Sequence, residues 1–83
     1  MTLDDLMQAE KRTVGVKQTE KAVNKGVALK VFVAKDSVER FTEKLVELCE
    51  EKAVSVVMVE TMHELGKACG IHVKAAAAAI LNP

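Results

Sequence analysis

Hydrophobic and charged positions alternate with a helical period in the middle of the chain. Apolar residues recur there three and four positions apart, and charged residues occupy most positions between them. The apolar stripe consists of Val38, Phe41, Leu45, Leu48 and Cys49. Such a stripe is typical of an amphipathic helix whose apolar face enters the core. We therefore expect a helix that is capped by Asp36 or Ser37 and ends near Lys52.

Two further helices are predicted in the first 26 residues. Thr2, followed three positions later by Asp5, is a variant of the capping box, and hydrophobic spacing continues from Leu3 to about Arg12. A second helix is expected over residues 17–25, because the glycine at position 26 is a typical helix stop.

Three segments are more typical of strands than of helices. Residues 29–36, LKVFVAKD, combine β-branched side chains with almost no helical period. Residues 54–60, VSVVMVE, form a nearly continuous apolar run, which predicts a strand buried on both faces. The run AAAAAIL is ambiguous, because alanine has the highest helix propensity but small side chains also suit a strand between helices. We favour a strand from about residue 75.

A short helix is expected between the last two of these strands. Thr61 and Glu64 form a second capping box, and Gly70 marks the end of the helix. Helices then alternate with buried strands, which predicts an α/β fold with a sheet between two helical layers. No linker or repeat divides the chain, so residues 1–83 are expected to form a single domain.

Charge is segregated along the chain, although the formal net charge is zero. Residues 11–35 hold seven bases and one acid, a net charge of +6, whereas residues 36–64 hold three bases and eight acids, a net charge of −5. This asymmetry can mark an anionic partner, but the signal is weak by itself, and a solvated helix face is the usual explanation of such lysines. With Phe32 and Phe41 as the only aromatic residues, proteins that stack bases on aromatic platforms are disfavoured.

The cellular compartment can be inferred from the cysteines and the apolar runs. Two cysteines do not make a disulfide framework, and the acidic N-terminus lacks the pattern of a signal peptide. The longest apolar run, AAAAAIL, is too short to span a bilayer. We therefore expect a cytoplasmic protein with reduced thiols and no membrane partner.

Thiol or metal chemistry has little support in the sequence. Cys49, Cys69, His63 and His72 could bind a metal in principle, but no pair has zinc-ligand spacing. The glycines of LGKACG fit no nucleotide-binding motif and are better explained by packing and capping. We expect no metal, no cofactor and no catalytic residue, and a small thiol or metal enzyme is the least favoured hypothesis.

Two segments, taken together, resemble a known family. They are GVKQTEKAVNKG (residues 15–26) and VETMHELGKACGIHVKAAAAAIL (residues 59–81). Both resemble the kink-turn RNA-binding ribosomal-protein family, above all its bacterial YbxF-type members, which are related to an archaeal large-subunit ribosomal protein. The resemblance covers essentially the whole chain. It implies a three-layer α/β/α sandwich around a small mixed sheet, in which the alanine run is a strand.

The resemblance also implies a function and a site. The family recognises RNA helices that bend sharply at a bulge flanked by sheared G·A pairs. The start of the second helix would contact these pairs, and the turn at residues 59–62 would pack on nucleotides that leave the bulge. The implied RNA-binding residues are Gly15, Lys17, Gln18, Lys21, Val59, Glu60, Thr61 and Met62. Glu60 departs from the family pattern, since some relatives carry a base there.

The expected partners are structured RNAs that contain kink-turns, such as ribosomal RNA or riboswitches. The ribosome itself is a further candidate, and the protein is expected to act as a monomer. Lys25 lies a turn further from the helix start, and RNA contact and a solvated helix face are equally good explanations for it. No spacing argument assigns a role to the remaining bases of residues 11–35, which are Lys11, Arg12, Lys30 and Lys35. The alternative is a protein-interaction adaptor of the same fold that has lost RNA binding and uses its acidic third helix.

Overall fold

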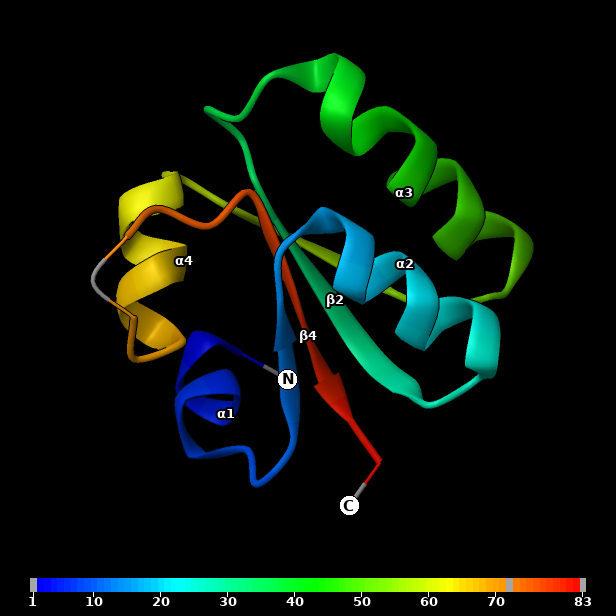
Figure 1. Ribbon diagram of the computed structural model, residues 1–83, viewed down its shortest axis with the longest axis horizontal. Helices are drawn as coiled ribbons and strands as arrows, with labels where there is room; N and C mark the ends of the chain where they lie inside the picture. The colour runs from blue at the N-terminus through cyan, green and yellow to red at the C-terminus, as the bar shows by residue number, and fades with distance from the viewer. Residues whose placement is uncertain (1, 72, 83) are drawn as a thin grey trace.

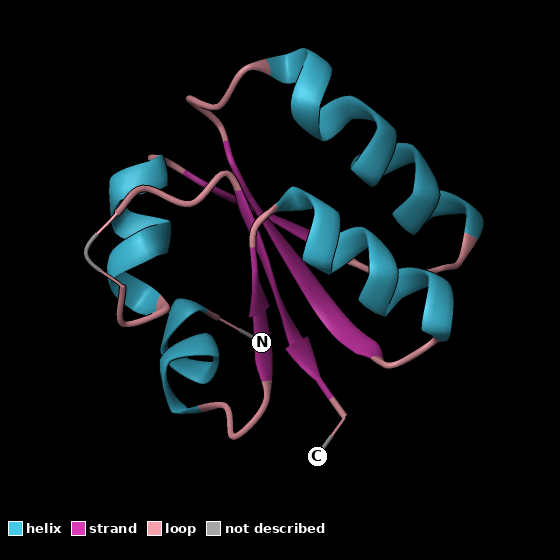
Figure 2. Cartoon of the chain, in the orientation of Figure 1, coloured by secondary structure: helices cyan, strands magenta, loops and turns pink. Residues whose placement is uncertain are grey.

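A four-stranded sheet lies between two pairs of helices in the computed structural model, which describes residues 2–71 and 73–82 (Figure 1). The elements are α1 (Leu3–Gln8), β1 (Arg12–Val14), α2 (Val16–Lys25), β2 (Ala28–Ala34), α3 (Glu39–Glu51), β3 (Val56–Val59), α4 (Met62–Ala68) and β4 (Ala77–Leu81). Helices α2 and α3 cover one face of the sheet, and α1 and α4 cover the other (Figure 2). The predicted three-layer α/β/α architecture is confirmed.

The sheet is mixed, with the strand order β1-β4-β2-β3. Strand β4 runs antiparallel to both of its neighbours, whereas β2 and β3 are parallel. Val33 pairs with Ala77, and Ala34 pairs with Val59. The last residues of β1, β2 and β3 therefore lie at the same end of the sheet as the start of β4. We call this the upper end, because it lies at the top of Figure 1.

The alanine run forms the interior strand β4, as the sequence predicted. Ala77 and Ala79 join the core on the side of α2 and α3, and Ala78 and Ile80 join the core on the side of α1 and α4. Phe32 pairs with Ala78 on the neighbouring strand. Alternate side chains of a strand face opposite layers, and the small alanines leave room for a helix on each face.

The N-terminal helix is shorter than the sequence pattern predicted. It ends at Gln8, and the predicted continuation is replaced by the edge strand β1, which starts at Arg12. The guanidinium of Arg12 donates to the carbonyl oxygens of Leu6 and Met7 at the end of α1 and of Cys69 after α4. These bonds satisfy carbonyl groups that a helix end leaves without partners. The guanidinium of Arg12 therefore stabilises the fold by binding the ends of two helices.

The first turn of α3 is the least accurately predicted part of the core. Val38 and Phe41 are 52% and 55% exposed, although both were expected to be buried, whereas Leu45 and Cys49 are fully buried. Figure 1 shows the first turn of α3 beyond the upper end of the sheet. The apolar stripe thus continues past the surface on which it packs.

The predicted caps of α3 serve other elements. The helix begins after Val38, which has no side-chain cap. The carboxylate of Asp36 instead accepts from the backbone N–H of Met62 at 2.7 Å. The hydroxyl of Ser37 donates to the carbonyl oxygen of Ala34 at 2.7 Å. Asp36 thereby joins the turn after β2 to the start of α4.

Strand β3 lies at an edge of the sheet, and Val59 is its only buried residue, so the prediction that this strand is buried on both faces is wrong. Met58 in this strand is 49% exposed. Helix α4 begins as predicted, since the hydroxyl of Thr61 accepts from the N–H of Glu64 at 3.0 Å. Within the described ranges, no helix is long and apolar enough to cross a bilayer.

Candidate nucleic-acid interface

A glycine opens helix α2 at the upper end of the sheet. Gly15 precedes the helix with φ 101° and ψ 153°, a conformation that only glycine adopts readily. Its N–H donates to the carbonyl oxygen of Ala77 at 2.8 Å, which fixes the start of α2 to β4. A Cβ atom at this position would meet no atom within 4 Å. The backbone conformation therefore requires glycine, and the space in front of the helix is open.

The first turn of α2 presents backbone donors that no helical carbonyl accepts. The N–H of Thr19 donates to the carbonyl oxygen of Gly15 at 3.1 Å. The N–H groups of Val16, Lys17 and Gln18 precede this bond and have no acceptor within the helix. Gly15 has no side chain to cap them, and the first turn contains no acid. The positive end of the helix dipole therefore favours an anion here.

Lys17, Gln18 and Lys21 are exposed on the outer side of α2. On the inner side, the fully buried hydroxyl of Thr19 lies 2.9 Å from that of Thr13, which links the helix to β1. Among the described residues, neither Lys17 nor Lys21 forms an ion pair. The exposed side chains therefore extend from a helix that is fixed to the sheet, and their charge is free for a ligand.

The turn between β3 and α4, residues 59–62, lies at the same end of the molecule. The N–H of Lys35 donates to the carbonyl oxygen of Val59 at 2.7 Å, and the N–H of Ala75 donates to that of Met62 at 3.1 Å. The segments that follow β2 and precede β4 thus hold the backbone of this turn. Strands β2 and β3 are parallel neighbours, so their last residues lie at the same edge of the sheet.

The four residues predicted to contact RNA in this turn differ in exposure. The side chain of Val59 is buried and belongs to the core, whereas Glu60 is exposed. Thr61 and Met62 are partly exposed, and the hydroxyl of Thr61 is already engaged as the cap of α4. Glu60 and Met62 therefore offer most of the side-chain surface of the turn.

Lys35 is a member of this site that sequence reasoning did not assign. Its ammonium group lies 2.9 Å from the carboxylate of Glu60, and the two side chains are 52% and 73% exposed. Lys35 follows β2 and Glu60 follows β3, so the parallel pairing of these strands brings the two together. Glu60, whose negative charge would repel phosphate, therefore has a basic neighbour.

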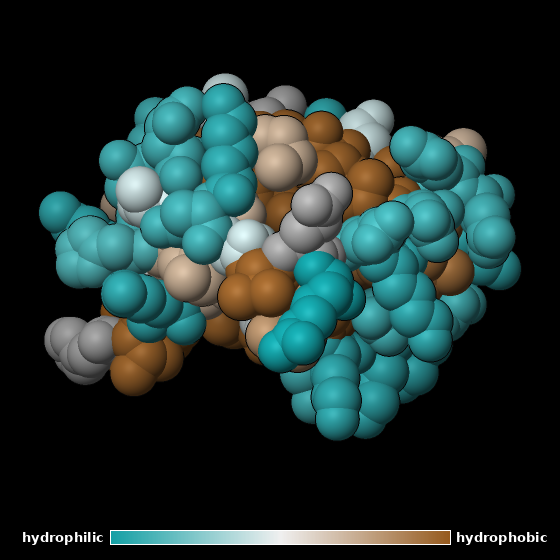
Figure 3. Space-filling view, turned by 90° about the horizontal axis from the view of Figure 1, so that it is seen from above, coloured by the Kyte–Doolittle hydropathy of each residue, from teal (hydrophilic) through white to brown (hydrophobic). Residues whose placement is uncertain are grey.

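The two predicted contact segments lie at opposite edges of the sheet. Gly15 follows β1 and Glu60 follows β3, with β4 and β2 between them. Three strand spacings separate them, roughly 14 Å in all. Figure 3 looks onto the molecule from above and shows hydrophobic surface in the middle with hydrophilic surface on both sides. A ligand of this width could touch both segments at once.

Known proteins resemble this chain in sequence and in fold. The family described as Ribosomal protein L7Ae/L30e/S12e/Gadd45 matches residues 1–83. The chain belongs to this family. An RNA-binding protein of Caldanaerobacter subterraneus is 51% identical over 69 residues, which cover 83% of this chain and 84% of the relative. The RNA-binding protein YbxF of Geobacillus stearothermophilus is 43% identical and covers 99% of this chain and 100% of the relative.

Other members of the L7Ae family extend the comparison. The large ribosomal subunit protein eL8 of Halobacterium salinarum is 48% identical over 81% of this chain and 57% of its own length. Among solved structures, the 15.5kD RNA binding protein of Giardia lamblia has a TM-score of 0.88 and 29% identity, covering 98% of this chain and 71% of that protein. The predicted resemblance is therefore confirmed at the level of the family.

The remaining bases of residues 11–35 do not form one patch in this L7Ae-family protein. Arg12 binds backbone carbonyls, and Lys35 is paired with Glu60. Lys25 lies in the last turn of α2, far from the open start of the helix. The basic segment of the sequence therefore divides among structural and surface roles, with Lys17 and Lys21 nearest the open helix end.

The cysteines lie in the core of this L7Ae-family protein. Cys49 and Cys69 are buried and unpaired. Burial raises the pKa of the Cys49 thiol. Burial also raises the pKa of Cys69, and the nearby charge of Arg12 partly opposes this effect. Protonated, buried thiols are poor nucleophiles and metal ligands, so the geometry gives thiol chemistry no support.

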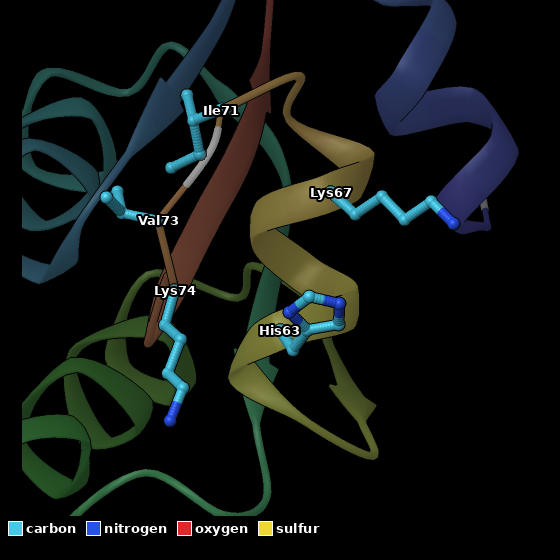
Figure 4. A pocket seen from close by; sticks show the side chains of 5 residues that line it. All are labelled: His63, Lys67, Ile71, Val73 and Lys74. Carbon is cyan, nitrogen blue, oxygen red and sulfur yellow. The ribbon is translucent and has the colours of Figure 1, made fainter.

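A hollow of about 630 Å³ lies beside α4, away from the open start of α2 (Figure 4). Its basic side chains do not converge, because Lys67 extends toward α1 whereas Lys74 extends in another direction. His63 also lines this hollow, and His72, the other histidine among the four candidate metal ligands, lies outside the described residues. Within residues 2–71 and 73–82, no three His, Cys, Asp or Glu side chains are grouped to hold a metal.

Proposed function

We propose that this protein binds structured RNA at kink-turns, where a bulge is flanked by sheared G·A pairs. The observation that carries the proposal is the open start of α2, where Gly15 leaves the backbone donors uncapped and Lys17, Gln18 and Lys21 are exposed. Family membership supports RNA binding, because relatives are named RNA-binding protein and large ribosomal subunit protein. The preference for kink-turns rests on the GVKQTEK segment.

The start of α2 suits a bent RNA helix. Free N–H groups at a helix N-terminus bind backbone phosphate. Lys17 and Lys21 can donate to guanine O6 and N7, and Gln18 can donate and accept at a neighbouring base edge. The major groove of regular A-form RNA is too narrow for such contacts, whereas a kink opens it locally. Bent RNA is therefore favoured over straight RNA.

The turn at residues 59–62 supplies the second contact of this proposal. Met62 is partly exposed, and its flexible side chain packs on nucleotides that leave the bulge. Lys35 reduces the repulsion between Glu60 and phosphate. Val59 supports the turn from the core, and Thr61 positions it through the cap of α4.

The proposal places the protein in the cytoplasm as a monomer without a cofactor or a catalytic role. Two unpaired cysteines in the core are typical of proteins from reducing compartments. The target is a kink in ribosomal RNA, a riboswitch or another structured RNA, because each presents the same G·A geometry.

A binding titration near physiological salt tests this function with two RNA duplexes of equal length. One duplex contains a bulge flanked by tandem G·A pairs, and the other keeps the bulge but has Watson–Crick pairs in their place. We expect tight binding to the first duplex alone. Equal and weak binding to both would contradict kink recognition, and a steep salt dependence would then indicate a general polyanion surface.

A protein-interaction adaptor is the second candidate, because α3 carries an exposed acidic surface formed by Glu43, Glu47, Glu50 and Glu51. This surface lies on α3, whereas the open helix start belongs to α2. Reversing the charges of Lys17 and Lys21 separates the two functions. Loss of RNA binding supports the first function, whereas an RNA-independent protein complex that survives the change supports the second.

A further inference from the structure

One edge of the sheet is open to a further strand. Strand β3 is the last in the strand order, so within the described residues it pairs with β2 alone. The carbonyl oxygens of Ser55 and Val59 accept from N–H groups of β2 and of the residue that follows it, at 3.1 Å and 2.7 Å. Backbone groups of alternate residues point to opposite sides of a strand. The N–H and C=O groups of Val56 and Met58 therefore point away from the sheet.

The edge strand lacks the features that usually prevent pairing with another chain. Residues 53–59 contain no charged residue and no proline. The register between β2 and β3 runs without a bulge. Met58 is 49% exposed, so apolar side-chain surface accompanies the free backbone groups. Edges of this kind are the ones to which an extended segment of another protein adds as a strand.

A hollow of about 370 Å³ lies beside this edge, on the side of α3. Met58 and Thr42 line it together with Ala34, Lys35 and Ser37 at the end of β2. A strand added to β3 would place every second side chain on this side of the sheet. The hollow would then receive one of these side chains, as pockets beside a paired edge do in other strand-binding proteins.

The side of α3 next to this edge is acidic. Thr42, Val46 and Glu50 are spaced by four residues and share one side of the helix, and Glu43 lies three positions before Val46. Val46 packs against the same core cluster as Val56 of β3. Glu43 and Glu50 are exposed, and among the described residues neither forms an ion pair. Basic side chains on an added strand would lie near these carboxylates.

We propose that the edge of β3 binds an extended, basic segment of a partner protein, which adds a fifth strand to the sheet. Lys35, the base in the lining of the hollow, is paired with Glu60 and opposes such a partner little. A second copy of the chain fits less well, because it would bring the acidic side of its own α3 against that of the first copy. The proposal does not rest on RNA binding, which uses the start of α2.

A titration with three blocked seven-residue peptides tests this inference by fluorescence anisotropy. The first peptide alternates arginine and valine, the second has glutamate in place of arginine, and the third is the first with every backbone nitrogen methylated. We expect the second and third to bind at least tenfold more weakly than the first. Equal affinities of the first and third would overturn strand addition. Equal affinities of the first and second would overturn the choice of a basic partner.

Amide hydrogen exchange locates the bound peptide. At nine-tenths saturation, exchange of the N–H groups of Val56 and Met58 should slow about tenfold, because only the free protein exchanges. Val14 is the matched control at the opposite edge. Its N–H points away from β4, since that of Gly15 donates to Ala77, and its exchange should not change. Unchanged exchange at Val56 and Met58 would place the peptide elsewhere and overturn the proposal.

Variants separate the backbone edge from the charge beside it. Met58→Pro removes an outward N–H but no bond to β2, and should weaken the first peptide more than tenfold. Met58→Ala keeps the edge and should lose about threefold, so equal losses would contradict strand pairing. Glu43→Gln with Glu50→Gln should lose about fivefold, as for two exposed ion pairs. The control, Asp4→Asn with Glu10→Gln around α1, should lose less than twofold. Thermal midpoints verify that each variant is folded.

Sedimentation of the peptide-free protein tests the competing occupant of this edge. The proposal expects a monomer whose Val56 and Met58 amides exchange rapidly. A dimer in which these amides are protected, and which the first peptide does not dissociate, would overturn the proposal. The edge would then belong to a second copy of the chain.

Discussion

Helices α2 and α4 both begin at the upper end of the sheet, yet their first turns are built in opposite ways. Helix α2 begins after Gly15, with no side-chain cap and no acid in its first turn. Helix α4 begins after Thr61, whose hydroxyl accepts from the N–H of Glu64 at 3.0 Å. The carboxylate of Asp36 accepts from the N–H of Met62 at 2.7 Å. One helix start is open, and the other is closed by the protein itself.

This difference shows that the location of a helix start is not enough to make an anion site. Oxygen atoms of the protein already satisfy two donors of α4, and Glu64 lies at the positive end of its dipole. The donors of α2 remain for a ligand. In the proposed interface, α2 therefore supplies charge, and the turn before α4 supplies shape and apolar contact.

Charge reversal at the open helix should have the largest effect. The double change Lys17→Glu and Lys21→Glu should lower the affinity for kink-turn RNA by about 100-fold or more, because each base contact contributes about 1–3 kcal/mol. The matched control, Lys67→Glu with Lys74→Glu, makes the same change of charge beside α4. It should cost about threefold at most, since salt screens distant charges. Fluorescence anisotropy measures both, and similar losses would mean that only net charge matters.

Giving α2 the kind of cap that α4 has should have the next largest effect. Gly15→Asp and Gly15→Ala both place a side chain in open space and share a backbone strain of about 1–3 kcal/mol. Only the aspartate can accept from the free N–H groups and repel phosphate. Gly15→Asp should therefore bind RNA about tenfold more weakly than Gly15→Ala, at similar thermal stability. Equal affinities would show that these donors do not contact RNA.

Most of the fold followed from patterns that are local in the sequence. Helix α2 ends where Gly26 predicts, and the cap of α4 involves residues only three positions apart. The errors arose from contacts between distant segments. Arg12, which binds carbonyls at the end of α1, also binds the carbonyl oxygen of Cys69, 57 positions away, and Asp36 caps a helix 26 positions away. Local propensity contains no information about such partners.

The sequence indicated which segments form the candidate site. The family resemblance indicated both segments, and the sheet places them at one end. The availability of each side chain was not predictable, because Val59 is buried, Thr61 is engaged as a cap and Glu60 is paired with Lys35. Phe41 shows the converse, since a residue with the spacing of a core position lies at the surface.

Removing the side-chain acceptor from the closed helix tests the other half of the comparison. Asp36→Ala should lower the free energy of unfolding by about 1 kcal/mol, as loss of a helix cap does. Asp36→Asn keeps an acceptor oxygen and should lose less. Chemical denaturation measures these differences, and the affinity of the folded protein for kink-turn RNA should not fall in either variant. A clear loss of RNA affinity with unchanged stability would mean that Asp36 contacts RNA directly.

The smallest expected effect concerns Glu60, the exposed acid of the turn before α4. Glu60→Gln releases Lys35 from its ion pair, so affinity for kink-turn RNA should rise about threefold, in line with the small energies of exposed pairs. The salt dependence should steepen by up to one phosphate contact. Adding Lys35→Gln to this variant should cancel both changes, because no free ammonium group then remains. If Glu60→Gln instead weakens binding, Glu60 itself accepts a hydrogen bond from RNA. The turn would then recognise bases as well as the shape of the RNA.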